Sequence, residues 1–160
     1  ELASGGMGSV HSAIQRGAEG FVRVVALKRI HPHLMQNRKF CEMFIDEARI
    51  ASRINHGSVC RIHDFGESPE GYFITMEYLV GEPFSRVLRA LQSRGDLTDS
   101  PRYPLVIARI IAGIAEGLHA AHTLTDDRGE RMDVVHRDVS PQNLFVLYDG
   151  TVRILSLIHI

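Results

Sequence analysis

A glutamate interrupts the apolar stripe of a predicted helix, and this feature constrains the fold more than any other. Within residues 37–54, apolar side chains recur every three or four positions, which is the spacing of one face of an α-helix. Asn37 is a suitable N-cap for this helix. One face of this helix carries Phe40, Phe44, Glu47, Ala51 and Ile54. A charge on a buried face is costly unless it has a partner of opposite sign, so Glu47 should face a cation.

The strand predicted before this helix offers that cation. Residues 22–30 are rich in β-branched side chains and are followed by Pro32. One face of the strand carries Val24, Ala26, Lys28 and Ile30. Lys28 is therefore also expected at a buried position, and a pair with Glu47 would satisfy both charges. The alternative is a shifted register of strand and helix, in which both charges face water.

The rest of the chain separates a strand-rich first part from a helix-rich second part. Strands are expected over residues 59–65 and 72–78, joined by a turn at 66–71. After Gly81, helices are expected over 84–93 and 104–122. Short strands are expected at residues 134–135, 144–147 and 152–155. This order favours an α+β fold.

Composition excludes several classes of function. The 160 residues carry a formal net charge of −1, which gives no support for a nucleic-acid or anionic-membrane partner. Cys41 and Cys60 stand far apart without metal-ligand spacing, and the histidines form no complete ligand set. The apolar stretch 105–115 contains Arg109 and is too short to span a bilayer. We therefore expect no membrane contact from this segment.

Two motifs carry chemistry. Residues 4–10, with the sequence SGGMGSV, form a glycine-rich turn whose backbone N–H groups are suited to phosphate oxygens, although many such loops are simple turns. Residues 136–143, with the sequence HRDVSPQN, are far more specific. They resemble the catalytic loop of protein kinases, and this resemblance implies that Asp138 orients the proton of a substrate hydroxyl and that Asn143 holds Mg²⁺ near phosphates. The alternative for this second motif is a polar surface turn built on Pro141.

The second motif resembles the catalytic loop of protein kinases, and the order of the parts strengthens this resemblance. A glycine-rich loop is followed by the sequence VALK ending at Lys28, by the helix with Glu47 and by HRDVSPQN. The GGMG and HRDVSPQN forms resemble bacterial, myxobacterial-like Hanks-type serine/threonine kinases. The resemblance implies an incomplete two-lobe protein-kinase-like fold, with a small lobe over 1–79 and the first part of the large lobe over 80–154.

The resemblance also implies a role for each matching residue, with ATP and Mg²⁺ as cofactors. Lys28 would hold the α- and β-phosphates and pair with Glu47, while Asp138 would be the catalytic base and Asn143 a metal ligand. Met76 would be the gatekeeper, and residues 77–79 the hinge. The implied nucleotide-binding residues are Leu2, Ala3, Ser4, Gly5, Gly6, Met7, Gly8, Val10, Ala26, Lys28, Met76, Glu77, Leu79 and Phe145.

The sequence departs from the kinase pattern in three places. Ala3 replaces the first glycine of the loop, a mild change if the backbone there is extended. Ser140 stands where serine/threonine kinases usually carry a lysine that contacts the transferred phosphate. The metal-binding sequence DFG occurs only at residues 64–66, before the catalytic loop, where we interpret it as a strand end and turn. The activation segment is therefore expected to be missing from this sequence.

The end of the sequence and the function follow from these departures. Residues 155–160, LSLIHI, resemble a translated sequencing adapter and are interpreted as a non-native tail. The resemblance implies a cytoplasmic kinase that phosphorylates serine or threonine on a protein, in a fragment that is inactive as written, and it is compatible with a membrane anchor elsewhere in the parent. The alternatives are a nucleotide-binding pseudokinase or scaffold and, less favoured, an aminoglycoside- or choline-type phosphotransferase.

Overall fold

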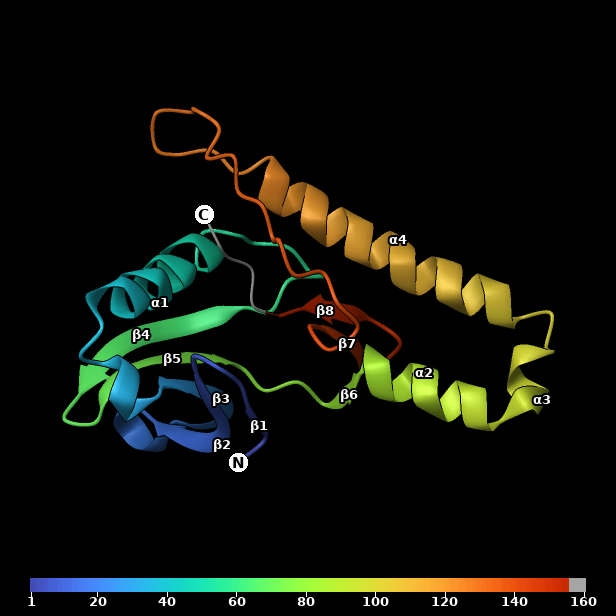
Figure 1. Ribbon diagram of the computed structural model, residues 1–160, viewed down its shortest axis with the longest axis horizontal. Coiled ribbons are helices and arrows are strands. Elements are labelled where there is room, and N and C mark those ends of the chain that lie inside the picture. The colour runs from blue at the N-terminus through green and yellow to red at the C-terminus, as the bar shows by residue number, and fades with distance from the viewer. Residues whose placement is uncertain (156–160) are drawn as a thin grey trace. The chain divides into compact units, whose positions relative to one another are not determined.

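The structure is a computed structural model that describes residues 1–155 (Figure 1). It divides into two compact units. The first unit contains residues 1–53 and 61–79, and the second contains residues 54–60 and those from 80 onward. The predicted tail, residues 155–160, lies outside the described residues except for Leu155.

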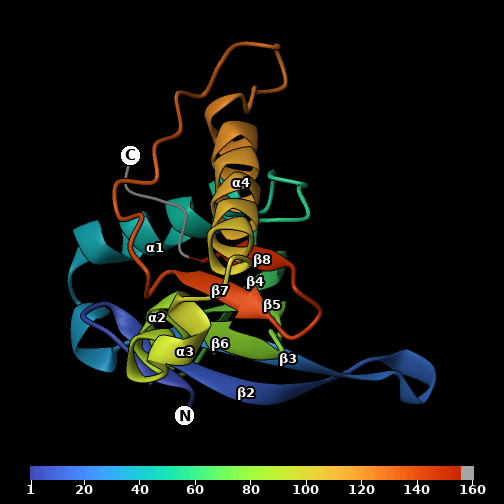
Figure 2. The same cartoon turned by 90° about the vertical axis from the view of Figure 1, so that its right-hand side faces the viewer.

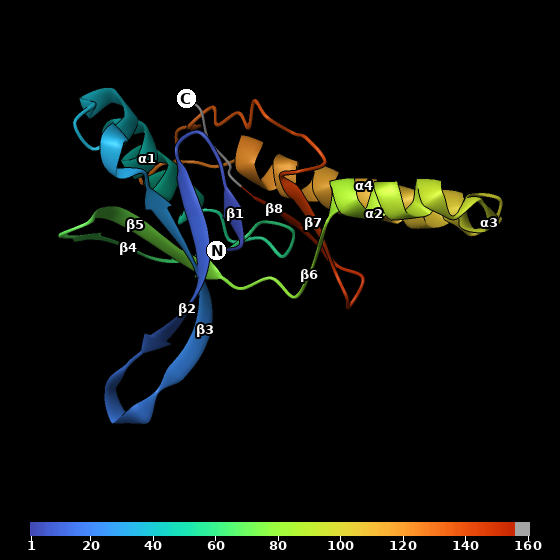
Figure 3. The same cartoon turned by 60° about the horizontal axis from the view of Figure 1, so that its bottom comes forward.

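The first unit is an antiparallel five-stranded sheet with one long helix. The sheet order is β1-β2-β3-β5-β4, and the strands are β1 Ala3–Ser4, β2 Gly8–Arg16, β3 Val22–Ile30, β4 Ile62–Ser68 and β5 Gly71–Glu77. Two 3₁₀ turns, Ala18–Gly20 and Pro32–Leu34, precede the helix α1, Arg38–Ala51. Figure 3 shows the β2–β3 hairpin extending beyond the part of β3 that pairs with β5, which begins at Val25.

Helix α1 begins where its sequence predicts. The side chain of Asn37 caps it by accepting a hydrogen bond from the backbone N–H of Lys39. The helix ends at Ala51, three residues earlier than the spacing suggests, because residues 52 and 53 form a turn. Its buried face closes a core formed by Ile30, Phe44, Ala48 and Ile74.

Strand β4 is displaced from its predicted position. The sequence predicted a strand over residues 59–65, but the observed strand is Ile62–Ser68. Val59 instead forms an isolated bridge with Ile154, and both residues belong to the second unit. Strand β4 passes through the predicted turn because Gly66 leaves room for the ring of Phe73, which would lie 2.5 Å from a Cβ there. Ile62 lies opposite Met76 and Asp64 opposite Thr75, so His63 is the extra residue of a β-bulge.

The second unit combines a small antiparallel sheet with three helices. The sheet order is β6-β7-β8, and the strands are β6 Gly81–Pro83, β7 Leu144–Leu147 and β8 Val152–Ile154. The helices are α2 Phe84–Ser93, α3 Gly95–Thr98 and α4 Tyr103–His122 (Figure 2). The strand expected at residues 134–135 is wrong, because Val134 is buried in an irregular segment by packing rather than by strand pairing.

Two glycines let α4 approach β8 closely. A Cβ at Gly113 would lie 2.7 Å from a methyl group of Val152, and one at Gly117 would lie 2.8 Å from Cδ1 of Ile154. The segment 54–60 belongs to the same packing, since the backbone N–H of Ile154 donates to the carbonyl of Ser58 at 2.8 Å. The sequence-based division placed this segment with the small lobe, whereas its contacts join it to the second unit.

Helix α4 is also the one helix of residues 1–155 that is long and apolar enough to cross a membrane. The prediction from residues 105–115 considered too short a window, because the apolar window of this helix spans 18 residues. Core helices of soluble proteins pass the same test of length and composition, and Ile110 and Ile114 are buried in this unit. The finding is therefore weak evidence for a membrane span.

Candidate active site

The first unit brings the two predicted charges together. The ammonium of Lys28 on β3 lies 2.6 Å from Oε2 and 2.7 Å from Oε1 of Glu47 on α1. The side chains are only 16% and 7% exposed, and the Lys28 nitrogen lies 5.6 Å from the centroid of the Phe44 ring. Each charge thus satisfies the other at a buried position. The alternative in which both charges face water is wrong.

The glycine-rich loop is a tight turn between β1 and β2. Strand β1 pairs Ala3 with Val10 and Ser4 with Ser9, and the N–H of Gly5 donates to the carbonyl of Gly8 at 2.9 Å. Ala3 lies in a strand, so its backbone is extended and the departure from glycine is mild there.

Gly8 is required by its surroundings. A Cβ at this position would lie 2.1 Å from the backbone carbonyl oxygen of Arg29, far inside van der Waals contact. Gly5 and Gly6, in contrast, have open space around their Cα atoms, so a side chain at either position would clash with nothing within 4 Å. Close approach of two strands therefore accounts for Gly8, whereas no such crowding accounts for Gly5 and Gly6.

The sheet register places several predicted nucleotide-binding residues beside Lys28. Val10 lies directly opposite Lys28, and Ala26 lies opposite Met76. Residues opposite one another in a sheet share a face, as do residues two apart in a strand. Val10, Ala26, Lys28 and Met76 therefore form one continuous face of the first unit.

The other predicted residues of the first unit lie at the ends of its strands. The backbone N–H of Leu2 donates to the carbonyl of Val10 at 2.8 Å, which holds Leu2 beside the glycine-rich loop. At the opposite end, the N–H of Glu77 donates to the carbonyl of Arg61, and Oε1 of Glu77 accepts from the N–H of Arg61. Leu79 is half-buried and ends the unit.

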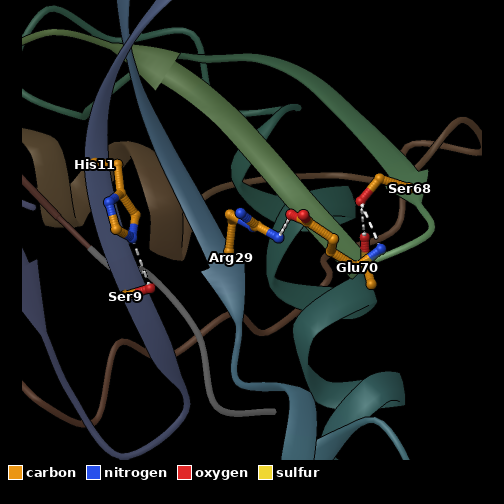
Figure 4. Close-up of polar contacts among 6 residues, drawn as sticks. Ser9, His11, Arg29, Ser68 and Glu70 are labelled. Atoms are coloured by element: carbon orange, nitrogen blue, oxygen red, sulfur yellow. Dashed lines mark hydrogen bonds and ion pairs between the residues drawn. The ribbon is translucent and has the colours of Figure 1, made fainter.

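The opposite face of the sheet carries a separate set of polar contacts (Figure 4). His11 and Ser9 are joined by a hydrogen bond of 2.9 Å within β2. Arg29 forms an ion pair with Glu70 in the β4–β5 turn, and the hydroxyl of Ser68 accepts from the N–H of Glu70 at 3.3 Å. Because Arg29 follows Lys28 directly, these contacts engage the side of β3 that points away from the Lys28–Glu47 pair.

The second unit holds the HRDVSPQN segment. The side-chain amide of Asn143 donates to Oδ2 of Asp138 at 2.7 Å and to its backbone carbonyl at 3.0 Å. These bonds fix the carboxylate against the amide nitrogen and leave the amide oxygen of Asn143 as an acceptor. Oxygen is the ligand atom that Mg²⁺ prefers, so the chemistry of Asn143 fits the predicted metal ligand.

His136 supports this loop from inside. It is 2% exposed, and its Nδ1 accepts from the backbone N–H of Asp138 at 3.3 Å. Its Nε2 lies 3.0 Å from the carbonyl of Leu155, and a carbonyl can only accept, so Nε2 carries the hydrogen. The N–H of Leu155 in turn donates to the carbonyl of Asn143 at 2.8 Å. Leu155, which the sequence suggested was part of a foreign tail, is therefore bonded to both ends of the HRDVSPQN segment.

The remaining predicted positions are placed as follows. Phe145 lies in β7, opposite Arg153 of β8. Ser140 accepts from the N–H of Asn143 through its carbonyl at 2.9 Å, and residues 139–142 contain no lysine or arginine.

The segment 64–66 lies within β4 rather than at a strand end, and Phe65 packs against the rings of Phe44 and Tyr72. Packing, rather than metal binding, accounts for this DFG sequence.

The structure adds one contact that the sequence did not suggest. His31, directly after β3, lies with its Nε2 2.9 Å from the carbonyl of Gly5 in the glycine-rich loop. Across residues 1–155, no group of three or more His, Cys, Asp or Glu side chains is arranged to hold a metal ion. The sequence showed only that His31 lies two residues from His33 without a complete set of metal ligands, which gave no indication of a loop contact.

Comparison with known proteins gives a consistent result. The family model described as the protein kinase domain matches residues 1–156. The chain is 43% identical over 156 residues to the tyrosine-protein kinase MasK of Myxococcus xanthus, covering 98% of this chain and 24% of MasK. It is 36% identical over 145 residues to the serine/threonine-protein kinase pkn2 of Myxococcus xanthus, covering 91% of this chain and 15% of pkn2.

Solved structures agree with these relatives. The crystal structure of the Mycobacterium tuberculosis PknI kinase domain matches with a TM-score of 0.64 and 26% identity. The match covers 98% of this chain and 56% of the PknI chain. The chain thus spans a quarter or less of these two curated relatives and little more than half of this solved domain.

Proposed function

Because the chain belongs to the protein kinase family, we propose that it carries the nucleotide-binding and catalytic-loop residues of an ATP-dependent protein serine/threonine kinase. Its relatives and structural neighbours are bacterial kinases, so the resemblance to Hanks-type kinases and the incomplete two-lobe α+β fold are confirmed. The observation that carries the functional proposal is the buried Lys28–Glu47 pair, which fixes an ammonium on the face with Val10 and Ala26.

The first unit supplies the groups that bind the nucleotide. Lys28 is held by Glu47 and would neutralise the α- and β-phosphates. Backbone N–H groups of the glycine-rich loop other than that of Gly5, which donates to the carbonyl of Gly8, would cover the phosphate chain. The apolar side chains of Leu2, Val10 and Ala26 would contact the adenine. The family resemblance implies an adenine contact for Phe145 as well. Met76 would be the gatekeeper, and Glu77 to Leu79 would meet the base through their backbone.

The second unit supplies the groups for phosphoryl transfer. Asp138 would accept or orient the proton of the acceptor hydroxyl, and the amide of Asn143 holds its carboxylate in place. Asn143 would hold Mg²⁺ through its side-chain oxygen. When bound, Mg²⁺ would neutralise charge on the phosphate oxygens. Ser140 brings no positive charge to this segment, so we expect slower transfer than in kinases with a lysine there.

The acceptor is proposed to be a serine or threonine hydroxyl on a protein. The relative pkn2 carries the name serine/threonine-protein kinase, which supports this choice. The relative MasK, at 43% identity, is named a tyrosine-protein kinase, and this observation favours tyrosine as a second candidate acceptor. We propose a cytoplasmic location for the domain and no nucleic-acid partner.

The 160 residues alone are proposed to be inactive. The sequence after Asn143 contains no DFG, and the chain covers only 56% of the PknI chain that it matches. Ser140, which stands where serine/threonine kinases usually carry a lysine, favours a nucleotide-binding pseudokinase as a second candidate function. The intact set of Lys28, Glu47, Asp138 and Asn143 favours catalysis by the full-length protein.

Phosphotransfer by the full-length protein tests this proposal. The wild type and Asp138→Asn are incubated with labelled Mg²⁺-ATP and with protein, aminoglycoside or choline acceptors, and labelled proteins are analysed for phosphoserine, phosphothreonine and phosphotyrosine. We expect label on serine or threonine and a loss of at least about 100-fold in Asp138→Asn, because a general base contributes that much. Asp96→Asn, at an exposed position of α3, is the control and should retain activity.

Each other outcome identifies an alternative. Label only on tyrosine would replace the proposed acceptor, and label only on a small molecule would replace the protein substrate. ATP binding without transfer to any acceptor would establish the pseudokinase.

A further inference from the structure

His31 contacts the glycine-rich loop twice, once through its backbone and once through its side chain. Its backbone N–H donates to the carbonyl of Met7 at 3.2 Å, which extends the pairing of β2 and β3 by one step. Its Nε2 lies 2.9 Å from the carbonyl oxygen of Gly5. Two of the loop's carbonyls are therefore held by one residue at the end of the strand that carries Lys28.

The chemistry of the side-chain contact fixes its direction. A carbonyl oxygen only accepts, so the Nε2 of His31 must carry a hydrogen and donate it to Gly5. This requirement is met by the neutral ring with its hydrogen on Nε2 and by the protonated ring. The contact therefore depends on a donor at the Nε2 position, which defines the substitutions that can replace it.

Holding the Gly5 carbonyl also orients the next amide. The described residues contain no cis peptide bond, and in a trans peptide the C=O and N–H groups point in opposite directions. The N–H of Gly6 is consequently directed away from His31. A Cβ at Gly6 would meet nothing within 4 Å, so no close packing occupies the side-chain direction of this residue.

We propose that His31 is a positioning residue that orients the glycine-rich loop for the phosphates of the nucleotide. This inference rests on the proposed function, since it assigns the loop amides to phosphate binding. Because His31 is three residues after Lys28 on the same chain segment, its contact with Gly5 fixes the position of the loop amides relative to the strand that carries Lys28. Without the side-chain contact, the Gly5–Gly6 peptide would rotate among several orientations, and phosphate binding would have to order it.

The neighbouring histidine provides a matched control. His33 stacks on His31, with ring centroids 5.4 Å apart and planes 17° from parallel, but its ring is not the one that reaches Gly5. Removing His33 takes away the stacking and a second imidazole ring while keeping the donor of His31. If stacking or charge were the important property, the two variants would behave alike.

Titration of the full-length protein with Mg²⁺-ATP and with adenosine tests the proposal. We expect His31→Ala to weaken ATP binding about three- to tenfold, the value of one net hydrogen bond, and to leave adenosine binding unchanged. His31→Gln places an amide donor near the Nε2 position and should restore most of the ATP affinity, whereas His31→Asn places it at the Nδ1 position and should not. His33→Ala should match the wild type.

Amide hydrogen exchange of the unliganded protein provides a readout that does not depend on the nucleotide. Exchange across residues 5–8 should rise in His31→Ala and His31→Asn and stay at the wild-type level in His31→Gln and His33→Ala. Unchanged exchange in His31→Ala, or an equal loss of ATP and adenosine affinity, would overturn the role of His31. A wild type that binds no ATP would instead refute the proposed function, and the exchange comparison would still decide whether His31 holds the loop.

Discussion

The two units differ in how completely each covers its own apolar surface. In the first unit, α1 closes the sheet so well that Phe44 is 0% and Ile74 1% exposed. In the second unit, α4 buries Ile110 and Ile114 but leaves Leu105 70% and Ile111 51% exposed. A helix with apolar residues on more than one face is suited to burial from more than one side. The first unit therefore supplies a closed core, whereas α4 carries more apolar surface than its own unit covers.

The largest effect is expected from the centre of the closed core. Phe44→Ala should lower the free energy of unfolding by about 3–5 kcal/mol, because it removes a fully buried ring and leaves a cavity. Urea denaturation and amide exchange in α1 and β5 would measure the loss. Phe21→Ala, at a position 56% exposed in the same unit, should change stability by less than about 0.5 kcal/mol. Similar losses in the two variants would contradict a core centred on Phe44.

A pair of isoleucines on α4 sharpens the comparison within the second unit. Ile114→Ala should cost about 2–4 kcal/mol because Ile114 is 5% exposed, whereas Ile111→Ala should cost less than about 0.5 kcal/mol. Exchange rates of α4 and β8 amides would report the difference locally. If Ile111→Ala were as damaging as Ile114→Ala in the full-length protein, the exposed face of α4 would be covered there by further parts of that protein.

The smallest effect concerns pH and the first unit alone. Burial lowers the pKa of His63 from its ordinary value of 6.5, and the charges of Arg23 and Arg61 lower it further, while Glu77 acts in the opposite direction. The unfolded chain therefore binds a proton at His63 more readily than the folded chain. The contribution of His63 to the free energy of unfolding is consequently fully present above pH 6.5, and it is lost as the pH falls toward the lower pKa of the folded state.

Urea denaturation midpoints, measured above pH 6.5 and at a lower pH, would test whether His63 lowers the stability of the protein as the pH falls. The decrease in stability at the lower pH should be smaller in His63→Gln than in the wild type. The difference should be modest because His63 is only partly buried and solvent screens the charges. A steeper decrease in His63→Gln would show that the pKa is raised in the folded protein.

The sequence predicted the Lys28–Glu47 pair because each residue breaks a local periodicity. The periodicity of a strand or a helix can be read from residues close together in the sequence. The predicted buried faces of the strand with Lys28 and of the helix with Glu47 both proved correct. The order of motifs likewise indicated the protein kinase family, to which the chain belongs. The positions of α1, α2 and α4 followed from the same local signals, to within three residues at each end.

Features that depend on distant partners were missed. Val59 has a sequence typical of a strand, but Ile154 is its bridge partner, so β4 begins later than expected. The contact of His31 with Gly5 exists because the β2–β3 register brings Gly8 opposite Ile30, a pairing that no local pattern specifies. The bond from Leu155 to Asn143 also joins positions that are not neighbours in the chain, and it assigns a structural role to a residue whose sequence context looked foreign.

The bulge in β4 has a consequence for how this chain can change in length. Loss of a residue from a regular strand turns every later side chain to the other face, so deletions within sheets are rarely tolerated. Removal of His63 would be different, because Ile62 already lies opposite Met76 and Asp64 opposite Thr75. The shortened strand would keep Phe65 directed at Phe44. Position 63 is therefore where related chains could gain or lose one residue of β4 without exchanging its two faces.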